Sequence, residues 1–147
     1  MKTTLGQVAV VLAVMSLALV PAAAQNAISA RSGMVHYVEG RVLLADKALE
    51  SKFGQFPEVK EKQVLRTEAG RAEILLTPGV FLRLDENAAI RMITSRLIDT
   101  RVEIESGTAM IEAVELLKDN NVTLVAKGSA VVLRKSGLYR INADTGQ

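Results

Sequence analysis

The sequence predicts an all-β protein, and two observations support this prediction. Turn residues recur about every 8–12 positions between short runs rich in β-branched side chains, a spacing typical of a sandwich, barrel or solenoid. The stretch from Thr67 to Leu84 has an apolar run on each side of Thr77-Pro78-Gly79. Pro78 presets φ at the first central position of a turn, and Gly79 supplies the positive φ required at the second. We therefore expect sequential short strands and hairpins that form a single sandwich or a short solenoid-like domain.

The composition limits the size and chemistry of this domain. A chain of 147 residues has the usual length of one domain. Cysteine and tryptophan are absent and the aromatic residues are three Phe and two Tyr, which predicts a mainly aliphatic core without disulfides or thiolate metal sites. The 18 basic and 16 acidic residues are scattered along the chain. Nucleic-acid binding, which needs a basic face, is therefore not expected.

The first 24 residues have the pattern of a secretory signal peptide. Lys2 supplies a positive charge, an apolar run extends from Val8 to Val20, and small residues occupy positions 22 and 24. An uncleaved membrane anchor is the alternative, but the 13-residue apolar run is shorter than the roughly 20 residues that span a bilayer. Cleavage after Ala24 would leave residues 25–147 as an exported domain, periplasmic or secreted, with no membrane span.

The first part of this mature chain is expected to hold strands and one irregular loop. The segment from Gly33 to Asp46 has the pattern of a strand, a glycine break or bulge at Gly40, and a second strand. Asp46-Lys47 is a turn candidate. The segment from Ser51 to Lys62 is predicted to be a surface loop with at most one short strand.

From Val64 onward, short strands are expected to alternate with turns. Besides the central hairpin, strands are predicted at 64–66, 89–93, 101–105, 108–114, 122–125, 130–133 and 138–141. The other turns are predicted at 68–70, 85–87, 106–107, 119–121, 128–129 and 136–137. Asp119-Asn120-Asn121 is suited to the positive φ values of a tight hairpin. The segment from Met110 to Lys118 would also suit a helix, but its place between two turn sequences favours a strand.

Several short sequence motifs between Val64 and Ile141 together resemble the FecR domain, an all-β periplasmic module of bacteria. The motifs that carry the resemblance are Leu65-Arg66-Thr67, 70–76, 79–84, 86–91 and 102–109, and the segment 33–44 is similar to the repeat that opens such domains. Two positions depart from the family pattern. Thr77-Pro78-Gly79 stands where the family usually has Asp-Gly, and residues 136–141 keep only the glycine and the alternation of a Gly-Thr-x-Phe-x-Val motif.

The resemblance implies the sensing or docking half of a FecR-type regulator. Such regulators carry a cytoplasmic segment that controls a sigma factor, then a membrane span, then the periplasmic domain. In this chain only Met1 to Gln7 precede the apolar run, so we expect no anti-sigma segment. The chain ends at Gln147 soon after a predicted strand, which leaves open that it is the N-terminal part of a longer protein.

No catalytic or metal-binding constellation is apparent. His36 is the only histidine, no Gly-x-Ser-x-Gly motif is present, and a half-exposed strand position is the expected role of His36. The acidic turns 85–87 and 119–121 lack the ligand spacing of a calcium loop, so turn chemistry explains them better. Glu103 and Glu105 share one strand face beside Arg101, and such a row of charges is typical of a solvated sheet face. We expect no catalytic residue, metal or cofactor.

The best candidates for partner binding are Phe53, Phe56 and Pro57, because aromatic residues on an irregular loop can anchor a partner. Alternatively, these three residues close a small core that contains few aromatic side chains. Open strand edges could also accept an extended peptide, unless charged residues such as Arg134 and Lys135 protect them.

The sequence therefore predicts an exported, non-enzymatic interaction or sensing module of the bacterial envelope. It is expected to bind a protein partner through strand edges and loops. A domain that binds carbohydrate or another envelope polymer is the alternative, and an enzyme is the third candidate.

Overall fold

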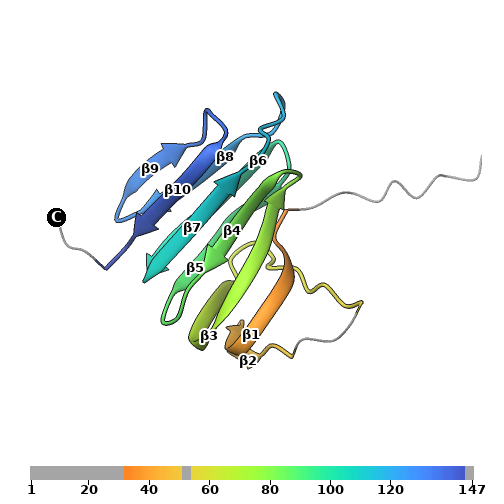
Figure 1. Ribbon diagram of the computed structural model, residues 1–147, viewed down its shortest axis with the longest axis vertical. Coiled ribbons are helices and arrows are strands. Elements are labelled where there is room, and N and C mark those ends of the chain that lie inside the picture. Colours follow the sequence, from red (N-terminus) through yellow and green to blue (C-terminus); the bar gives the residue numbers. More distant parts are fainter. Residues whose placement is uncertain (1–31, 51–53, 145–147) are drawn as a thin grey trace, which may run out of the picture.

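The computed structural model describes residues 32–50 and 54–144, and these residues form a single curled β-sheet without helices (Figure 1). The all-β prediction is confirmed. The strands are β1 (Met34–Leu44), β2 (Lys47–Ala48), β3 (Val64–Thr77), β4 (Val80–Leu84), β5 (Ala89–Arg96), β6 (Asp99–Ser106), β7 (Thr108–Ala113), β8 (Val122–Ala126), β9 (Ser129–Val132) and β10 (Gly137–Asn142).

The long strand β3 organises the sheet. One side of β3 pairs with β1, and the other side pairs with β5 near its start and with β4 near its end. Two arms leave β3 in this way, and the strand order is β10-β7-β4-β3-β5-β6-β8-β9. All pairs are antiparallel except β6 with β8. Because the arms curl toward the same side, the sheet has the shape of a half-barrel (Figure 1).

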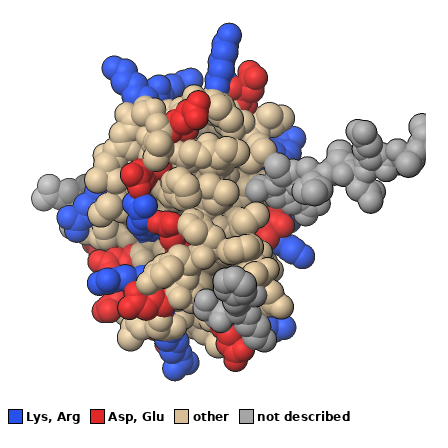
Figure 2. Space-filling model, turned by 45° about the vertical axis from the view of Figure 1, so that its right-hand side comes forward, with Lys and Arg blue, Asp and Glu red and all other residues tan. Residues whose placement is uncertain are grey.

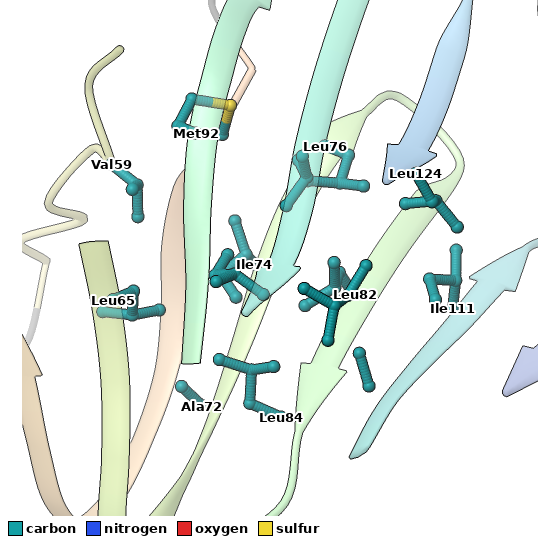
Figure 3. Packing of buried hydrophobic residues seen from close by; sticks show 14 of the residues in the cluster. Val59, Leu65, Ala72, Ile74, Leu76, Leu82, Leu84, Met92, Ile111 and Leu124 are labelled. Atoms are coloured by element: carbon teal, nitrogen blue, oxygen red, sulfur yellow. The ribbon is translucent and has the colours of Figure 1, made fainter. Parts of the chain in front are cut away.

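The core lies on the inner face of this curl and is aliphatic. Buried and more exposed residues alternate along β4 and β6, as expected for a sheet with one covered face. Ile74, Leu82 and Leu124 are fully buried and come from both arms (Figure 3). Burying each such side chain contributes about 1.5–3 kcal/mol. None of the described Phe or Tyr residues is buried, so the expected aliphatic core is confirmed.

The predicted hairpin at Thr77-Pro78-Gly79 is present between β3 and β4. Thr77 is paired with Val80, and Gly79 has the positive φ of 81°. A Cβ atom at Gly79 would lie 2.8 Å from the carbonyl oxygen of Glu115, so packing as well as φ favours glycine.

The predicted turn at 68–70 is wrong, because these residues lie inside β3. Gly70 is paired with Gly40 of β1, where the two strands approach closely. A Cβ atom at Gly70 would lie 2.5 Å from the carbonyl oxygen of Glu39. Gly40 itself has a φ of 67° beside a register shift, which confirms the predicted bulge. Glycine at position 70 permits a close crossing of two strands and does not form a turn.

The predicted hairpin at Asp119-Asn120-Asn121 is also wrong. None of these residues has a positive φ, and β8 pairs in parallel with β6 instead of folding back on β7. Both sides of β7 are already occupied, by β4 and by β10, whereas β6 has a side available. Residues 114–121 therefore cross to the other arm. The backbone N–H of Thr100 donates to the carbonyl oxygen of Asn121 at 2.8 Å and fixes the start of β8.

The preference for strand over helix in the segment 110–118 is confirmed for Met110–Ala113, which belong to β7; the rest is irregular. Most other predicted strands and turns occur close to their expected positions. The predicted turn near Asp46 is formed by Ala45 and Asp46, which have φ values of 48° and 63°. The predicted signal peptide lies outside the described residues. Residues 32–50 and 54–144 contain no helical segment that could span a bilayer.

Candidate binding surface

A row of side chains crosses the outer face of the arm formed by β1, β3, β4, β7 and β10. The strand register places residues of successive strands directly opposite one another, on the face that the core does not use. A register shift in β1 sets two of its residues opposite one residue of β3. From β1 to β10 the row comprises His36 with Tyr37, Glu73, Arg83, Met110 and Arg140.

The centre of this row is a chain of polar contacts, two of which are ion pairs of Arg83. His36 Nε2 lies 2.5 Å from Glu73 Oε1, and Arg83 pairs with the other carboxylate oxygen of Glu73. Arg83 also contacts Glu112, with Nη2 and Oε2 2.7 Å apart. Hydrogen bonds to Glu112 and Glu73 raise the pKa of Arg83. The side chain of Glu73, only 18% exposed, is thus held between His36 and Arg83.

Aromatic residues of this face lie next to the ion pairs. The ring of Phe81 packs edge to face against His36, with 5.7 Å between the ring centroids. Tyr37 is 50% exposed, and its hydroxyl donates a hydrogen bond of 2.8 Å to Glu39. That hydrogen bond is the main reason why the pKa of Tyr37 is raised above 10.0. The face therefore combines an exposed tyrosine and a half-buried phenylalanine with charged side chains.

Two shallow hollows lie along this face and share Arg71, Arg83 and Leu84 in their lining. The larger, of about 400 Å³, is next to His36 and Tyr37. The smaller, of about 170 Å³, extends to Arg140. Figure 2 shows one face of the molecule, on which acidic and basic side chains are interspersed. Such a surface suits a partner with polar groups of both signs.

The sequence-predicted loop candidates are only partly described. Phe53 lies outside the described residues. Phe56 is 56% exposed, and Pro57 is half-buried; its carbonyl oxygen accepts a hydrogen bond of 2.8 Å from the N–H of Val35. Both line a recess of about 360 Å³ beside Ala48 and Leu49. Pro57 thus helps to cover the edge of β1, and Phe56 remains a predicted binding residue.

The other polar candidates have structural partners. Arg91 pairs with Glu105 and lies 3.8 Å from Glu103, so the two carboxylates belong to a charged sheet face. Asp85 pairs with Arg71 at 3.2 Å, in a turn where Asn87 has a φ of 56°. Among the described residues, no cluster of three or more metal-ligating side chains occurs. These charged side chains are therefore engaged with one another on the sheet face and its turns.

Sequence reasoning did not single out β9. In the described part of the chain this strand pairs with β8 on one side only, and all four of its residues are exposed. The strand β10 forms the opposite edge of the sheet and is likewise paired on one side, with β7. The two edges are joined by only the segment 133–136. The absence of charge in Ser129–Val132 was visible in the sequence, but its position at an edge was not.

The described residues therefore define an open all-β sheet. Its two outermost strands are paired on one side only, and its outer face combines polar and aromatic side chains. Comparison of the chain with protein-family models, curated proteins and solved structures gives no match in any of the three.

Proposed function

We propose that the protein is a non-catalytic interaction or sensing module of the bacterial envelope that binds a protein partner through its sheet edges and loops. The observation that carries the proposal is the incomplete closure of the barrel: within residues 32–50 and 54–144, β9 and β10 are each paired on one side only. Unpaired backbone groups at such edges are suited to receive an extended segment of another protein.

The envelope location rests on the sequence. The N-terminal pattern of charge, apolar run and Ala-x-Ala supports export, and the resemblance to FecR domains supports a sensing or docking role. Export would place the edges and the outer face in contact with periplasmic or extracellular proteins. No cofactor enters this proposal.

Carbohydrate binding is the second candidate, because Tyr37 is exposed beside the larger hollow. Its ring could stack on a sugar, while Arg71 and Glu73 at the same hollow offer hydrogen bonds. This candidate uses the outer face, whereas the favoured one uses the edges. The two proposals therefore predict different sensitive residues.

The test compares retention of envelope proteins by the immobilised protein with its binding to a glycan array. Envelope proteins that the Tyr37→Ala variant still retains support the favoured proposal. Binding to glycans alone, abolished by Tyr37→Ala, contradicts it. A screen of hydrolase substrates tests the third class: activity that His36→Ala abolishes would show that the protein is an enzyme.

A further inference from the structure

The strand β9 differs from the other edges of the sheet because no charged residue or proline lies within it; Arg134 and Lys135, the expected protective charges, lie beyond its end. The outer side of β1 is partly covered, since Val35 donates to Pro57 and Leu49 donates to Val42. A charged residue, Arg140, lies within β10. By contrast, Ser129-Ala130-Val131-Val132 contains neither charge nor proline, and its two valines are 45% and 38% exposed. Natural edges are usually protected against unwanted pairing, so an unprotected edge indicates a site of intended pairing.

The backbone of β9 is oriented to accept a further strand. The N–H of Leu133 donates to the carbonyl oxygen of Val122 at 3.0 Å, so this pair is a hydrogen-bonded one. Hydrogen-bonded and non-hydrogen-bonded pairs alternate in antiparallel ladders. The N–H and C=O groups of Ala130 and Val132 therefore point away from β8, toward the open side. An incoming strand finds two donors and two acceptors there.

The charged residues of the chain segment that contains β9 have one sign. From Val122 to Ala143 the chain contains four basic residues and no acidic one. Lys127 precedes β9 in its hairpin turn, and Arg134 and Lys135 follow it, so cations stand at both ends of the apolar edge. Neither Arg134 nor Lys135 makes an ion pair within the described part of the chain. A strand with acidic ends would complement this arrangement.

The same charges disfavour a second copy of the chain as the occupant. Symmetric antiparallel pairing through the outward groups of Ala130 and Val132 would be centred on Val131. It would bring Lys127 of one copy opposite Lys135 of the other. Like charges directly opposite each other destabilise a strand pair.

We propose that the edge of β9 binds an extended segment of a partner protein, in which a short run of β-branched residues is flanked on both sides by Asp or Glu. This inference rests on the proposed function and adds the location of the site and the chemistry of the partner. The apolar residues of the segment pack beside Val131 and Val132. Its acidic ends lie near Lys127 at one end and Arg134 and Lys135 at the other.

The test uses synthetic peptides and the full chain as it is expressed and processed by the host cell. One peptide has a core of alternating Val and Thr flanked by Asp; a second has the same core flanked by Lys; a third keeps the Asp flanks but has proline in the core. Fluorescence anisotropy measures binding. We expect the first peptide to bind, the second to bind about tenfold more weakly or worse, and the third not to bind.

Two matched pairs of variants locate the site. Val132→Pro removes an outward N–H without touching the bonds to β8 and should abolish binding, whereas Val132→Thr keeps that N–H and should bind. The double substitution Arg134→Glu and Lys135→Glu should weaken binding, and Lys47→Glu, on β2, should not. Circular dichroism confirms that each variant is folded.

The inference is overturned if none of the peptides binds, if the proline-containing peptide binds as well as the first, or if folded Val132→Pro retains binding. A dimer in sedimentation that Val132→Pro dissociates would also overturn it, because a second copy would then occupy the edge. If the peptides do not bind but the Val132→Pro variant still retains envelope proteins, this inference fails and the proposed function stands. Glycan binding alone would remove both.

Discussion

At the scale of single residues, two buried threonines of β3 have opposite roles. Thr67 Oγ1 accepts a hydrogen bond of 3.0 Å from the N–H of Ala88 and donates one of 2.5 Å to the carbonyl oxygen of Asp85. Thr77 Oγ1 is equally buried and has no partner among the described residues. The first hydroxyl attaches β3 to the turn that follows β4, whereas the second is a buried polar group without compensation.

Replacing each threonine by valine should therefore have different consequences. Thr67→Val leaves the buried N–H of Ala88 without an acceptor and should lower the free energy of unfolding by about 1–3 kcal/mol. Thr77→Val removes a polar atom that makes no hydrogen bond and should leave stability unchanged or slightly raised. Urea unfolding of the two variants measures the difference. An equal loss in both would contradict these roles.

The hydrogen bond between Tyr37 and Glu39 should be visible in a pH titration. Because Glu39 raises the pKa of Tyr37 above 10.0, this tyrosine should ionise later than an unperturbed one. The phenol form is favoured by folding, so the stabilisation is complete below pH 10 and disappears as the pH rises through the raised pKa. Ultraviolet difference titration should show a lower pKa for Tyr37 in Glu39→Gln. The Tyr37→Phe variant lacks this ionisation step and thereby assigns it to Tyr37. If the pKa of Tyr37 is unchanged in Glu39→Gln, Glu39 does not contribute to it.

At the scale of elements, the crossing of β1 and β3 depends on a glycine pair. The space for a side chain at Gly70 is filled by the backbone of β1, because atoms of Glu39 and Arg41 lie within 3 Å of the place that a Cβ atom would take. These atoms belong to the backbone, so they cannot move aside without disturbing the ladder. The two longest strands of the protein can therefore stay paired through the bend only with glycine there.

A comparison of two glycine substitutions tests this close approach. Gly70→Ala should destabilise the protein strongly, by about 3 kcal/mol or more, because overpacking against backbone forces the strands apart. Gly128 has a φ of 76° in the β8–β9 turn, but nothing lies within 4 Å of its Cβ position. Gly128→Ala should therefore cost only the strain of the turn, about 1 kcal/mol. Thermal unfolding gives both values, and equal losses would show that packing at Gly70 is not limiting.

At the scale of the whole molecule, β3 lies at the centre of the half-barrel and β9 at its margin. β3 is paired on both sides along much of its length, whereas β9 is paired within the described residues on one side only, and its four residues are exposed. Stability should fall along each arm from β3 to its outer edge, because local opening is easiest where few contacts are lost. This gradient leaves the β9 edge able to adapt to an incoming strand.

Amide hydrogen exchange should reveal both the gradient and the orientation of β9. Amides in β3 such as that of Ile74 should exchange slowest. Within β9, the amides of Ala130 and Val132 should exchange fast and that of Val131 more slowly, since only the last points to β8. Protection of Ala130 and Val132 in the isolated protein would show that the edge is already occupied.

The sequence by itself determined the fold class, the aliphatic core and nearly all strand positions, because these follow from local alternation and turn chemistry. Gly79 and Gly40 were correctly interpreted, since their positive φ is a local property. Only the tertiary structure decided the role of Gly70 and the parallel pairing of β8 with β6, because both depend on residues far away in the chain. The same holds for the candidate sites. The alternation of residues shows on which face of β9 each valine lies. Whether β9 lies at an open edge is decided only by the order of the strands, because closure of a sheet depends on all its strands together.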